Sequence, residues 1–226
     1  MDRLTIIRLL MTKKKLKNYL EIGVFNGHIF FRIRSSFKIA VDPEFRFDAL
    51  RKAGKIILNP YNLYNRYYRK PSDDFFREDA PSLLSKKHID ISLIDGMHEY
   101  GYALRDIENT VKYLSDDGVI IVHDCNPLTP ESACSFKQWE ARGFTGTWNG
   151  DVWKAILHIR SLRKDLTAFV LDTDHGLGVV VKKPAERLLD FSAEQIGALG
   201  FDDFDRNRKE WLGLQPESYL HEFFGV

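Results

Sequence analysis

The sequence lacks a cysteine framework, an excess of one charge and a long apolar run. Its 226 residues include only two cysteines, Cys125 and Cys134, too few for a disulfide scaffold and typical of a reducing cytosol. The formal net charge of +1 gives no reason to expect nucleic-acid binding. No apolar run has the length of a membrane span, and no signal-peptide pattern is present. We therefore expect a cytoplasmic protein without membrane insertion and without a nucleic-acid partner.

Basic residues nevertheless gather in two places, at Lys13–Lys17 and, among several tyrosines, at Arg66–Lys70. Charge runs of this kind are usually solvated faces or loops. The segment Asn59–Pro71, which contains the second group, is rich in Tyr, Asn and Arg. We interpret it as an insertion or flexible lid, although its aromatic density could equally reflect packing against a partner.

The first motif is a glycine turn between two short apolar runs. The run Tyr19–Ile22 is followed by two glycines four residues apart, Gly23 and Gly27, and a second run ends in Asp42. A strand, a tight turn, a helix and a strand ending in an acid are typical of the first half of a nucleotide-binding α/β sheet. The sequence therefore predicts a nucleoside at this turn.

The turn lacks the middle glycine of the dinucleotide pattern, where a bare backbone lets a pyrophosphate approach. Phe25 stands there instead, and Glu21 would repel a pyrophosphate but could pair with an ammonium group. Asp42 can accept hydrogen bonds from both ribose hydroxyls of any adenosine. The motif thus favours a cationic amino-acid nucleoside over NAD.

A second group of polar residues follows two later strands. The run Ile89–Asp95 predicts a buried strand ending in Asp95-Gly96, and the nearly all-apolar Val119–Val122 delivers His123 and Asp124. Ligands of open α/β sheets bind at the carboxyl ends of the strands. We therefore expect these acids and histidines, together with His98, to converge on the edge that carries the glycine turn.

The alternation of apolar periods predicts a doubly wound, mostly parallel seven-stranded sheet with an antiparallel closing strand. One sizeable core fits this length, with residues 1–183 as the main domain and 184–226 as a helical extension. That extension would pack on the domain or on a partner subunit in a homo-oligomer. The remaining expected elements are helices over 4–11, 45–53, 99–114 and 152–162, a third strand over 55–58, and closing strands over 166–171 and 178–181.

Together these motifs resemble the class I S-adenosylmethionine-dependent methyltransferases. A more specific resemblance is to the group that includes small-molecule and sugar O-methyltransferases and cephalosporin hydroxylase-like proteins. It is carried by the segments Ile94–Tyr100 and His123–Pro127, together with Asp106. The segments Ser72–Phe76 and Asn207–Leu212 are similar to that group as well. Ile29 stands where many relatives have a small hydroxyl residue, which puts one contact to the cofactor's carboxylate in doubt.

The resemblance implies S-adenosyl-L-methionine as cofactor and a small-molecule hydroxyl, of a sugar or another metabolite, as acceptor. The implied cofactor-binding residues are Glu21, Gly23, Val24, Phe25, Asn26, Gly27, Asp42, Pro43, Asp74, Phe75, Asp95 and Gly96.

Methyl transfer from a sulfonium needs an aligned acceptor that loses its proton. His98 or His123 could act as general base, with Asp124 as a further catalytic residue. Alternatively Asp95 and Asp124, with Asn126, could hold Mg²⁺ and lower the pKa of the acceptor. Related metal-dependent O-methyltransferases have metal-binding acids at these two strand ends.

Simpler interpretations remain open. Glu21 could cap a helix, Asp95-Gly96 could be only a turn, and Asp174-His175 is expected to be a hairpin turn. Two other classes also remain: a nicotinamide-dependent oxidoreductase of doubly wound fold, and a non-catalytic module that binds the cofactor.

Overall fold

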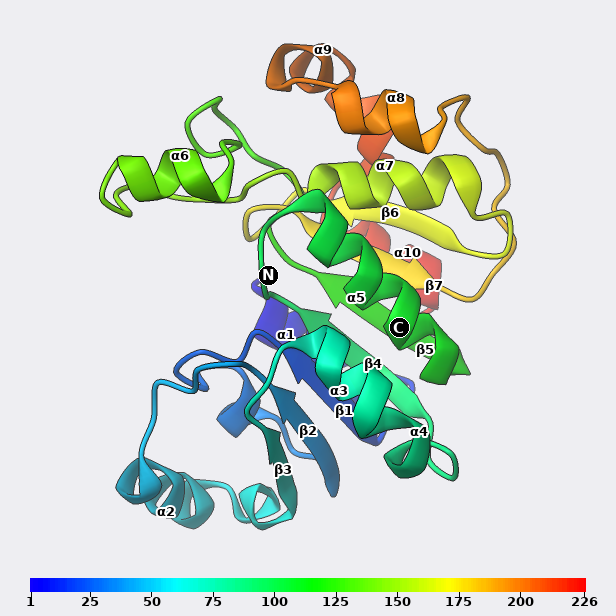
Figure 1. Ribbon diagram of the computed structural model, residues 1–226. Helices are drawn as coiled ribbons and strands as arrows, with labels where there is room; N and C mark the ends of the chain where they lie inside the picture. Colours follow the sequence, from blue (N-terminus) through cyan, green and yellow to red (C-terminus); the bar gives the residue numbers. More distant parts are fainter.

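The computed structural model describes all 226 residues as an eight-stranded sheet between two layers of helices (Figure 1). The strand order is β3-β2-β1-β4-β5-β7-β6-β8. β7 runs antiparallel to β5 and β6, whereas all other neighbours are parallel. The predicted doubly wound sheet with an antiparallel closing strand is therefore confirmed, with one strand more than expected. The strands are β1 (Asn18–Ile22), β2 (Phe37–Val41), β3 (Asn65–Tyr68), β4 (Ile89–Ile94), β5 (Leu114–Val122), β6 (Thr167–Leu171), β7 (Leu177–Val181) and β8 (Leu214–Gln215).

Each face of the sheet has its own core, because successive strand residues point to opposite sides. In β5, Ile120 and Val122 join a cluster of 33 buried residues with α3, α5, α7, α8 and α9. Val119 and Ile121 join a second cluster of 23 residues with α1, η1 and α10. The helices are α1 (Arg3–Lys13), η1 (Phe30–Arg32), α2 (Ala49–Leu58), η2 (Pro60–Tyr64), α3 (Ser72–Glu78), α4 (Ala80–Leu83), α5 (Tyr100–Tyr113), α6 (Phe136–Ala141), α7 (Trp153–Leu162), α8 (Ala193–Ala198), α9 (Phe201–Leu212) and α10 (Tyr219–Phe224).

The prediction was wrong between residues 45 and 71. The expected strand over 55–58 is the second half of α2, which begins after the N-cap Asp48. The actual third strand, β3, lies within the tyrosine-rich segment expected to be an insertion, and pairs with β2. The apolar run Ile56–Leu58 was misread because Ile57 and Leu58 are exposed, whereas a central strand would bury them.

The C-terminal extension covers both faces of the sheet. On one face, Phe204 of α9 stacks on Trp153 of α7 with ring centroids 4.5 Å apart. On the other, Phe223 of α10 packs on Phe169 of β6. Between them β8 pairs with β6. Residues 184–226 thus contact their own chain along the last strands.

None of the helices combines the length and apolarity that crossing a bilayer requires.

Candidate functional site

The glycine turn after β1 lies directly against the end of β4. Gly23 has a φ of +81°, and a Cβ there would collide with the carbonyl oxygen of Asp95. Gly27 has a φ of +73°, and a Cβ there would collide with the ring of Phe31. Both positions therefore favour glycine, the first because of a neighbouring backbone carbonyl and the second because of a neighbouring side chain.

The residues between these glycines differ in their exposure. Val24 is buried, whereas Phe25 has a φ of +48° and leaves 59% of its surface exposed. Asn26 accepts a hydrogen bond from the backbone N–H of His28 at 2.9 Å. Phe25 therefore covers the rim of the turn in a left-handed conformation that costs energy for a bulky residue.

Asp42, at the end of β2, fixes the turn from the side. One carboxylate oxygen accepts from the N–H of Phe25 and the other from the N–H of Glu44, both at 2.7 Å. The side chain is buried, and Pro43 beside it is exposed. A carboxylate offers about four acceptor positions, so these bonds leave capacity for ligand hydroxyls.

Glu21 is buried beside the turn without a cationic partner. The hydroxyl of Tyr19 donates to it, and no lysine or arginine pairs with it. Burial raises the pKa of Glu21 to about 8, despite the opposing effect of the Tyr19 hydrogen bond. A cation placed next to this carboxyl would favour its ionised form.

At the ends of β4 and β5, two acids and two histidines form one cluster. Nδ1 of His123 lies 2.8 Å from Asp124 and 3.1 Å from Asp95. Nδ1 of His98 lies 3.3 Å from Asp124, and its Nε2 lies 3.5 Å from Asp95. The structure thus brings together the four residues that the sequence placed on this edge.

The segment between α6 and α7 closes over this cluster. The carbonyl of Trp148 lies 2.8 Å from Nδ1 of His98, and the Trp148 ring stacks on the imidazole. Asn149 donates to Asp124 at 2.6 Å. Gly150, with a φ of +60°, touches the carbonyl of His98 so closely that no Cβ would fit.

The contact with Trp148 assigns the protonation of neutral His98. A carbonyl oxygen only accepts, so Nδ1 carries the proton and Nε2 has the free lone pair. Burial lowers the pKa of His98, but the neighbouring Asp95 and Asp124 outweigh burial and raise it. Burial likewise disfavours ionised Asp95, yet its bonds to the two histidines hold its pKa well below the usual range. Nε2 of His98, whose nearest carboxylate oxygen lies 3.5 Å away, is the least engaged nitrogen of the two rings.

Two further residues, missed in the sequence, complete the cluster. Arg3 of α1 donates to both carboxylate oxygens of Asp174 at 3.0 Å, and its Nη1 lies 2.7 Å from Nε2 of His123. Asp174 forms the hairpin turn expected before β7, but its carboxylate points into the site. Asp174, His175 and Gly176 all have a positive φ, as this tight turn requires, and nothing in the sequence linked Arg3 to Asp174.

Arg3 and three carboxylates hold the ring of His123 in place. Burial lowers the pKa of His123, but hydrogen bonds with Asp124, Asp174 and Asp95 outweigh it and raise the pKa to about 11. A ring with this pKa is an imidazolium at neutral pH, whose Nδ1–H faces Asp124 at 2.8 Å and whose Nε2–H faces Asp174 at 3.5 Å. Both ring nitrogens are engaged, which leaves His123 less free than His98 to receive a proton.

The structure alters the expected metal-ligand set. Asp95, His98 and Asp124 each offer an atom within 4.8 Å of the others. Asn126 instead accepts from Arg208 of α9 and donates to Asp172 at 3.1 Å. Two carboxylates suit a divalent cation, but a histidine nitrogen in the set suits a transition metal better than Mg²⁺.

The start of α3 supplies the other predicted cofactor residues. Phe75 is completely buried against Tyr68, with ring centroids 4.8 Å apart, and Asp74 pairs with Arg77. Nearby, Asp106 of α5 is buried, and its carboxylate would lie 3.8 Å from a Cβ at Gly96. Burial raises the pKa of Asp106 to about 7.

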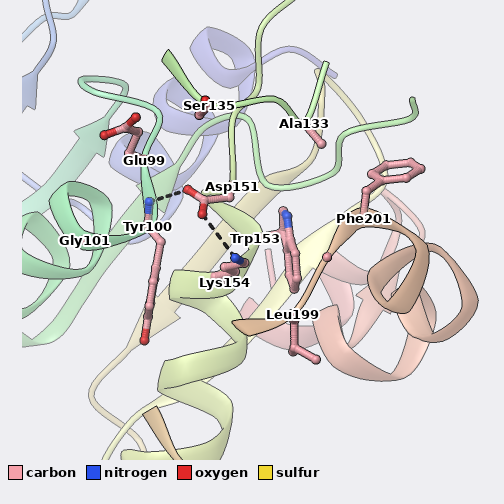
Figure 2. A pocket seen from close by; sticks show the side chains of 11 residues that line it. Glu99, Tyr100, Gly101, Ala133, Ser135, Asp151, Trp153, Lys154, Leu199 and Phe201 are labelled. Atoms are coloured by element: carbon pink, nitrogen blue, oxygen red, sulfur yellow. Dashed lines mark hydrogen bonds and ion pairs between the residues drawn. The ribbon is translucent and has the colours of Figure 1, made fainter. Parts of the chain in front are cut away.

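Two cavities flank the cluster. The first, of about 360 Å³, lies where the starts of α5 and α7 meet the turn between α8 and α9 (Figure 2). There Asp151 accepts from the N–H of Tyr100 at 2.6 Å and faces Lys154 at 3.4 Å. The second, of about 330 Å³, contains a single hydrophobic residue, Leu128. Its other lining residues are Asn126, Thr129, Glu131, Ser132, Arg142, Thr145, Gly146, Thr147, Asn149 and His175.

The second cavity adjoins the catalytic candidates through Asn149, which also binds Asp124. Six of its eleven lining residues belong to the segment 132–150.

Comparisons with known proteins agree with this geometry. Residues 20–125, from β1 to the end of β5, match the family model of a methyltransferase domain. No curated protein matches the chain in sequence.

Solved structures with the same fold include several O-methyltransferases. One is the O-methyltransferase TomG from Streptomyces achromogenes, which is involved in tomaymycin synthesis and was solved in complex with S-adenosylmethionine. It is 13% identical, with a TM-score of 0.57 over 80% of this chain and 79% of that chain. Another is from Bacillus cereus, in complex with S-adenosylhomocysteine, and is 13% identical with a TM-score of 0.58 over 80% of each chain. A putative caffeoyl-CoA O-methyltransferase from Staphylococcus aureus is 16% identical, with a TM-score of 0.53 over 80% of this chain and 84% of that chain.

Proposed function

Residues 20–125 match the model of a methyltransferase domain and the chain has the fold of S-adenosylmethionine-bound O-methyltransferases, and from that premise we propose that it methylates a hydroxyl of a sugar or another small metabolite with S-adenosylmethionine as donor. The observation that carries the proposal is the position of His98. Its free Nε2 lies in a cluster that directly adjoins the glycine turn, because Gly23 contacts the backbone of Asp95.

The residues around the turn fit S-adenosyl-L-methionine. Bound there, the cofactor supplies a methyl group already activated by a positively charged sulfur. Buried Glu21 would pair with its ammonium group, and Asp42 would accept from its ribose hydroxyls while retaining the bonds that shape the turn. Asp95 and Gly96 close the opposite side.

His98 would act as the general base. Its Nδ1–H is fixed by the Trp148 carbonyl, so Nε2 is the atom that receives the acceptor's proton. Asp95 and Asp124 stabilise the imidazolium that results, and Arg3 and His123 keep these carboxylates in place. Asp124 would thus act through the ring orientation and charge of His98.

The acceptor would occupy the polar cavity beside Asn149. Hydroxyl, amide, carboxylate and guanidinium groups line it, whereas only one hydrophobic side chain does. Such a lining offers many hydrogen-bond partners and little apolar area, which favours a polyhydroxylated acceptor over a planar aromatic one.

A divalent metal ion held by Asp95 and Asp124 would be a second way to activate the acceptor hydroxyl. The ligand atoms of Asp95, Asp124 and His98 lie within 4.8 Å of one another, which is close enough for one ion. Activity that falls in chelator and returns with an added divalent ion would support it. Full activity in chelator would leave His98 as the base.

Calorimetric titration with S-adenosylmethionine, S-adenosylhomocysteine and NAD tests the cofactor. We expect both sulfur nucleosides to bind and NAD to fail, because Phe25 stands where the dinucleotide pattern needs its middle glycine and because the carboxyl of Glu21 would repel a pyrophosphate. Binding of NAD alone would favour an oxidoreductase. Binding of the sulfur nucleosides without turnover of any hydroxyl acceptor in a broad panel would favour a non-catalytic module.

A further inference from the structure

The outer face of α2 is apolar and uncovered. Leu50, Ile57 and Leu58 are 83%, 82% and 77% exposed, and Leu63 of η2 is 66% exposed. Leu50 and Ile57 are seven residues apart and therefore lie on the same side of the helix, with Ala53 and Gly54 between them. In Figure 1, α2 lies outside the β2–β3 edge of the sheet, away from the other helices.

The opposite face of α2 explains why the apolar residues point outward. Lys52 lies over the rings of Phe47 and Tyr67, 5.5 and 4.3 Å from their centroids. The side chain of Asn62 binds the carbonyl of Lys55 at 2.8 Å. Lys52 and the Lys55 carbonyl therefore hold the inner side of α2 on the domain, so that Leu50, Ile57 and Leu58 face outward, with the exposed Arg51 beside them.

The charge of this region is also one-sided. Residues 49–70 contain six Lys or Arg and no Asp or Glu, a formal charge of +6, while the whole chain carries +1. Only Lys70 among these six forms ion pairs, with Glu78 and Asp79. The other cations are Arg51, Lys52, Lys55, Arg66 and Arg69.

We propose that α2 and η2 form a docking surface for an anionic phospholipid bilayer. The exposed aliphatic side chains would enter the boundary between headgroups and acyl chains, and the exposed Arg51 and Arg69 would bind lipid phosphates. Lys52 and Arg66 would stay over the rings of Tyr67 and Phe37. This attachment is peripheral, because α2 lies on the membrane and does not cross it.

The charge argues against the other partners. A second copy of the chain would bring another +6 region against this one, and like charges repel. Nucleic acid matches the charge but gives no burial to Leu50, Ile57 and Leu58. An anionic bilayer satisfies both the charge and the apolar surface.

Sedimentation with vesicles tests the proposal. We expect the protein to bind vesicles of phosphatidylglycerol and phosphatidylcholine mixed in equal parts, and not vesicles of phosphatidylcholine alone. Binding should fall as salt is raised, because salt screens the charges. The variant Leu50→Ser/Ile57→Ser/Leu58→Ser should bind about tenfold more weakly or worse, and Arg51→Gln/Lys55→Gln about fivefold more weakly for each charge removed.

The matched controls lie on other surfaces. Leu188→Ser removes a partly exposed leucine, and Arg187→Gln/Arg206→Gln removes two exposed arginines. Both should bind vesicles as the wild type does. Absence of binding to anionic vesicles, equal binding to neutral ones, or equal loss in the controls would overturn the proposal.

Sedimentation equilibrium without lipid tests whether a second copy of the chain, rather than a membrane, covers α2. A wild-type dimer that the triple serine variant converts to monomer would show that a second copy covers α2, and would likewise overturn membrane docking. A monomer at all concentrations is the expected result.

Discussion

The strand ends of β4 and β5 and the outer face of α2 distribute polarity in opposite ways. The first gathers carboxylates, imidazoles and a guanidinium in a largely buried cluster. The second leaves leucine and isoleucine side chains in solvent. Burying charged groups and exposing apolar groups both reduce the stability of an isolated domain. Both features are therefore better explained by the binding of a ligand than by a contribution to stability. The difference is that the cluster is braced by internal hydrogen bonds, whereas the α2 face has no partner within the chain.

Removing the basic nitrogen of the cluster should have the largest effect. In His98→Asn, the amide can still donate to the Trp148 carbonyl, but no group remains to receive a proton. We expect kcat to fall about 10²- to 10⁴-fold with cofactor affinity retained. Steady-state kinetics with a hydroxyl acceptor and calorimetry measure the two quantities.

His88→Asn, at an exposed histidine, is the control and should retain full activity. If His98→Asn turned over normally, the base would have to be sought elsewhere in the cluster.

Glu21→Gln should weaken S-adenosylmethionine binding about tenfold to a hundredfold, because a charge-assisted hydrogen bond is lost. With a pKa of about 8, Glu21 is mostly protonated at pH 7 before the cofactor binds. A cationic ligand favours the ionised form, so binding at pH 7 should release protons from Glu21.

Calorimetry in buffers of different ionisation enthalpy detects that release as a dependence of the binding enthalpy on the buffer. Glu21→Gln should lose this dependence. An unchanged proton release in the variant would exclude Glu21 as its source.

Asp106 tests the cost of a buried acid outside the cluster. Its folded-state pKa of about 7 lies above the 3.8 of an aspartic acid in an unfolded chain, so the folded protein keeps a proton that the unfolded chain loses. Stability should therefore fall as the pH rises from about 4 to 7, by at most about 4 kcal/mol. Asp106→Asn should be more stable than wild type at pH 8 and close to it at pH 4.

Urea unfolding at the two pH values provides the measurement. A variant less stable than wild type at pH 8 would show that the ionised carboxylate contributes favourable contacts.

The smallest effect is expected at α2. The triple variant Leu50→Ser/Ile57→Ser/Leu58→Ser should change the free energy of unfolding by no more than about 0.5 kcal/mol per residue. The reason is that these three side chains are largely exposed in the monomer. Thermal unfolding of the lipid-free protein checks this. A large loss of stability would mean that α2 packs more deeply than its exposure indicates.

The parts of the fold that the sequence predicted share one property. β1, β4 and β5 are buried on both faces, so an uninterrupted apolar run was sufficient to identify them. At the β2–β3 edge that rule failed, because β3 is half-exposed and polar while Ile57 and Leu58 lie on an exposed helix face. Packing on the outer side of β2, rather than local pattern, decided which segment became the strand.

The site was predictable where adjacent strand ends carry it. Asp95, His98, His123 and Asp124 follow from the parallel sheet, since β4 and β5 are neighbours. Arg3 and Asp174 come from an N-terminal helix and a hairpin turn 171 residues apart, and only tertiary packing brings them together. The contact of Asn126 with Arg208, from the distant C-terminal extension, could not be foreseen for the same reason.

Asp124 has a consequence for any attempt to engineer this protein. It has a φ of +61°, a conformation that glycine adopts without strain, and it buries a carboxylate. Glycine there would relieve the backbone but would leave the side chain of Asn149 and Nδ1 of His123 without their acceptor, so a library selected for heat resistance should retain Asp124. Stabilising substitutions are therefore to be sought away from this cluster, whose hydrogen bonds compensate the strain at residue 124.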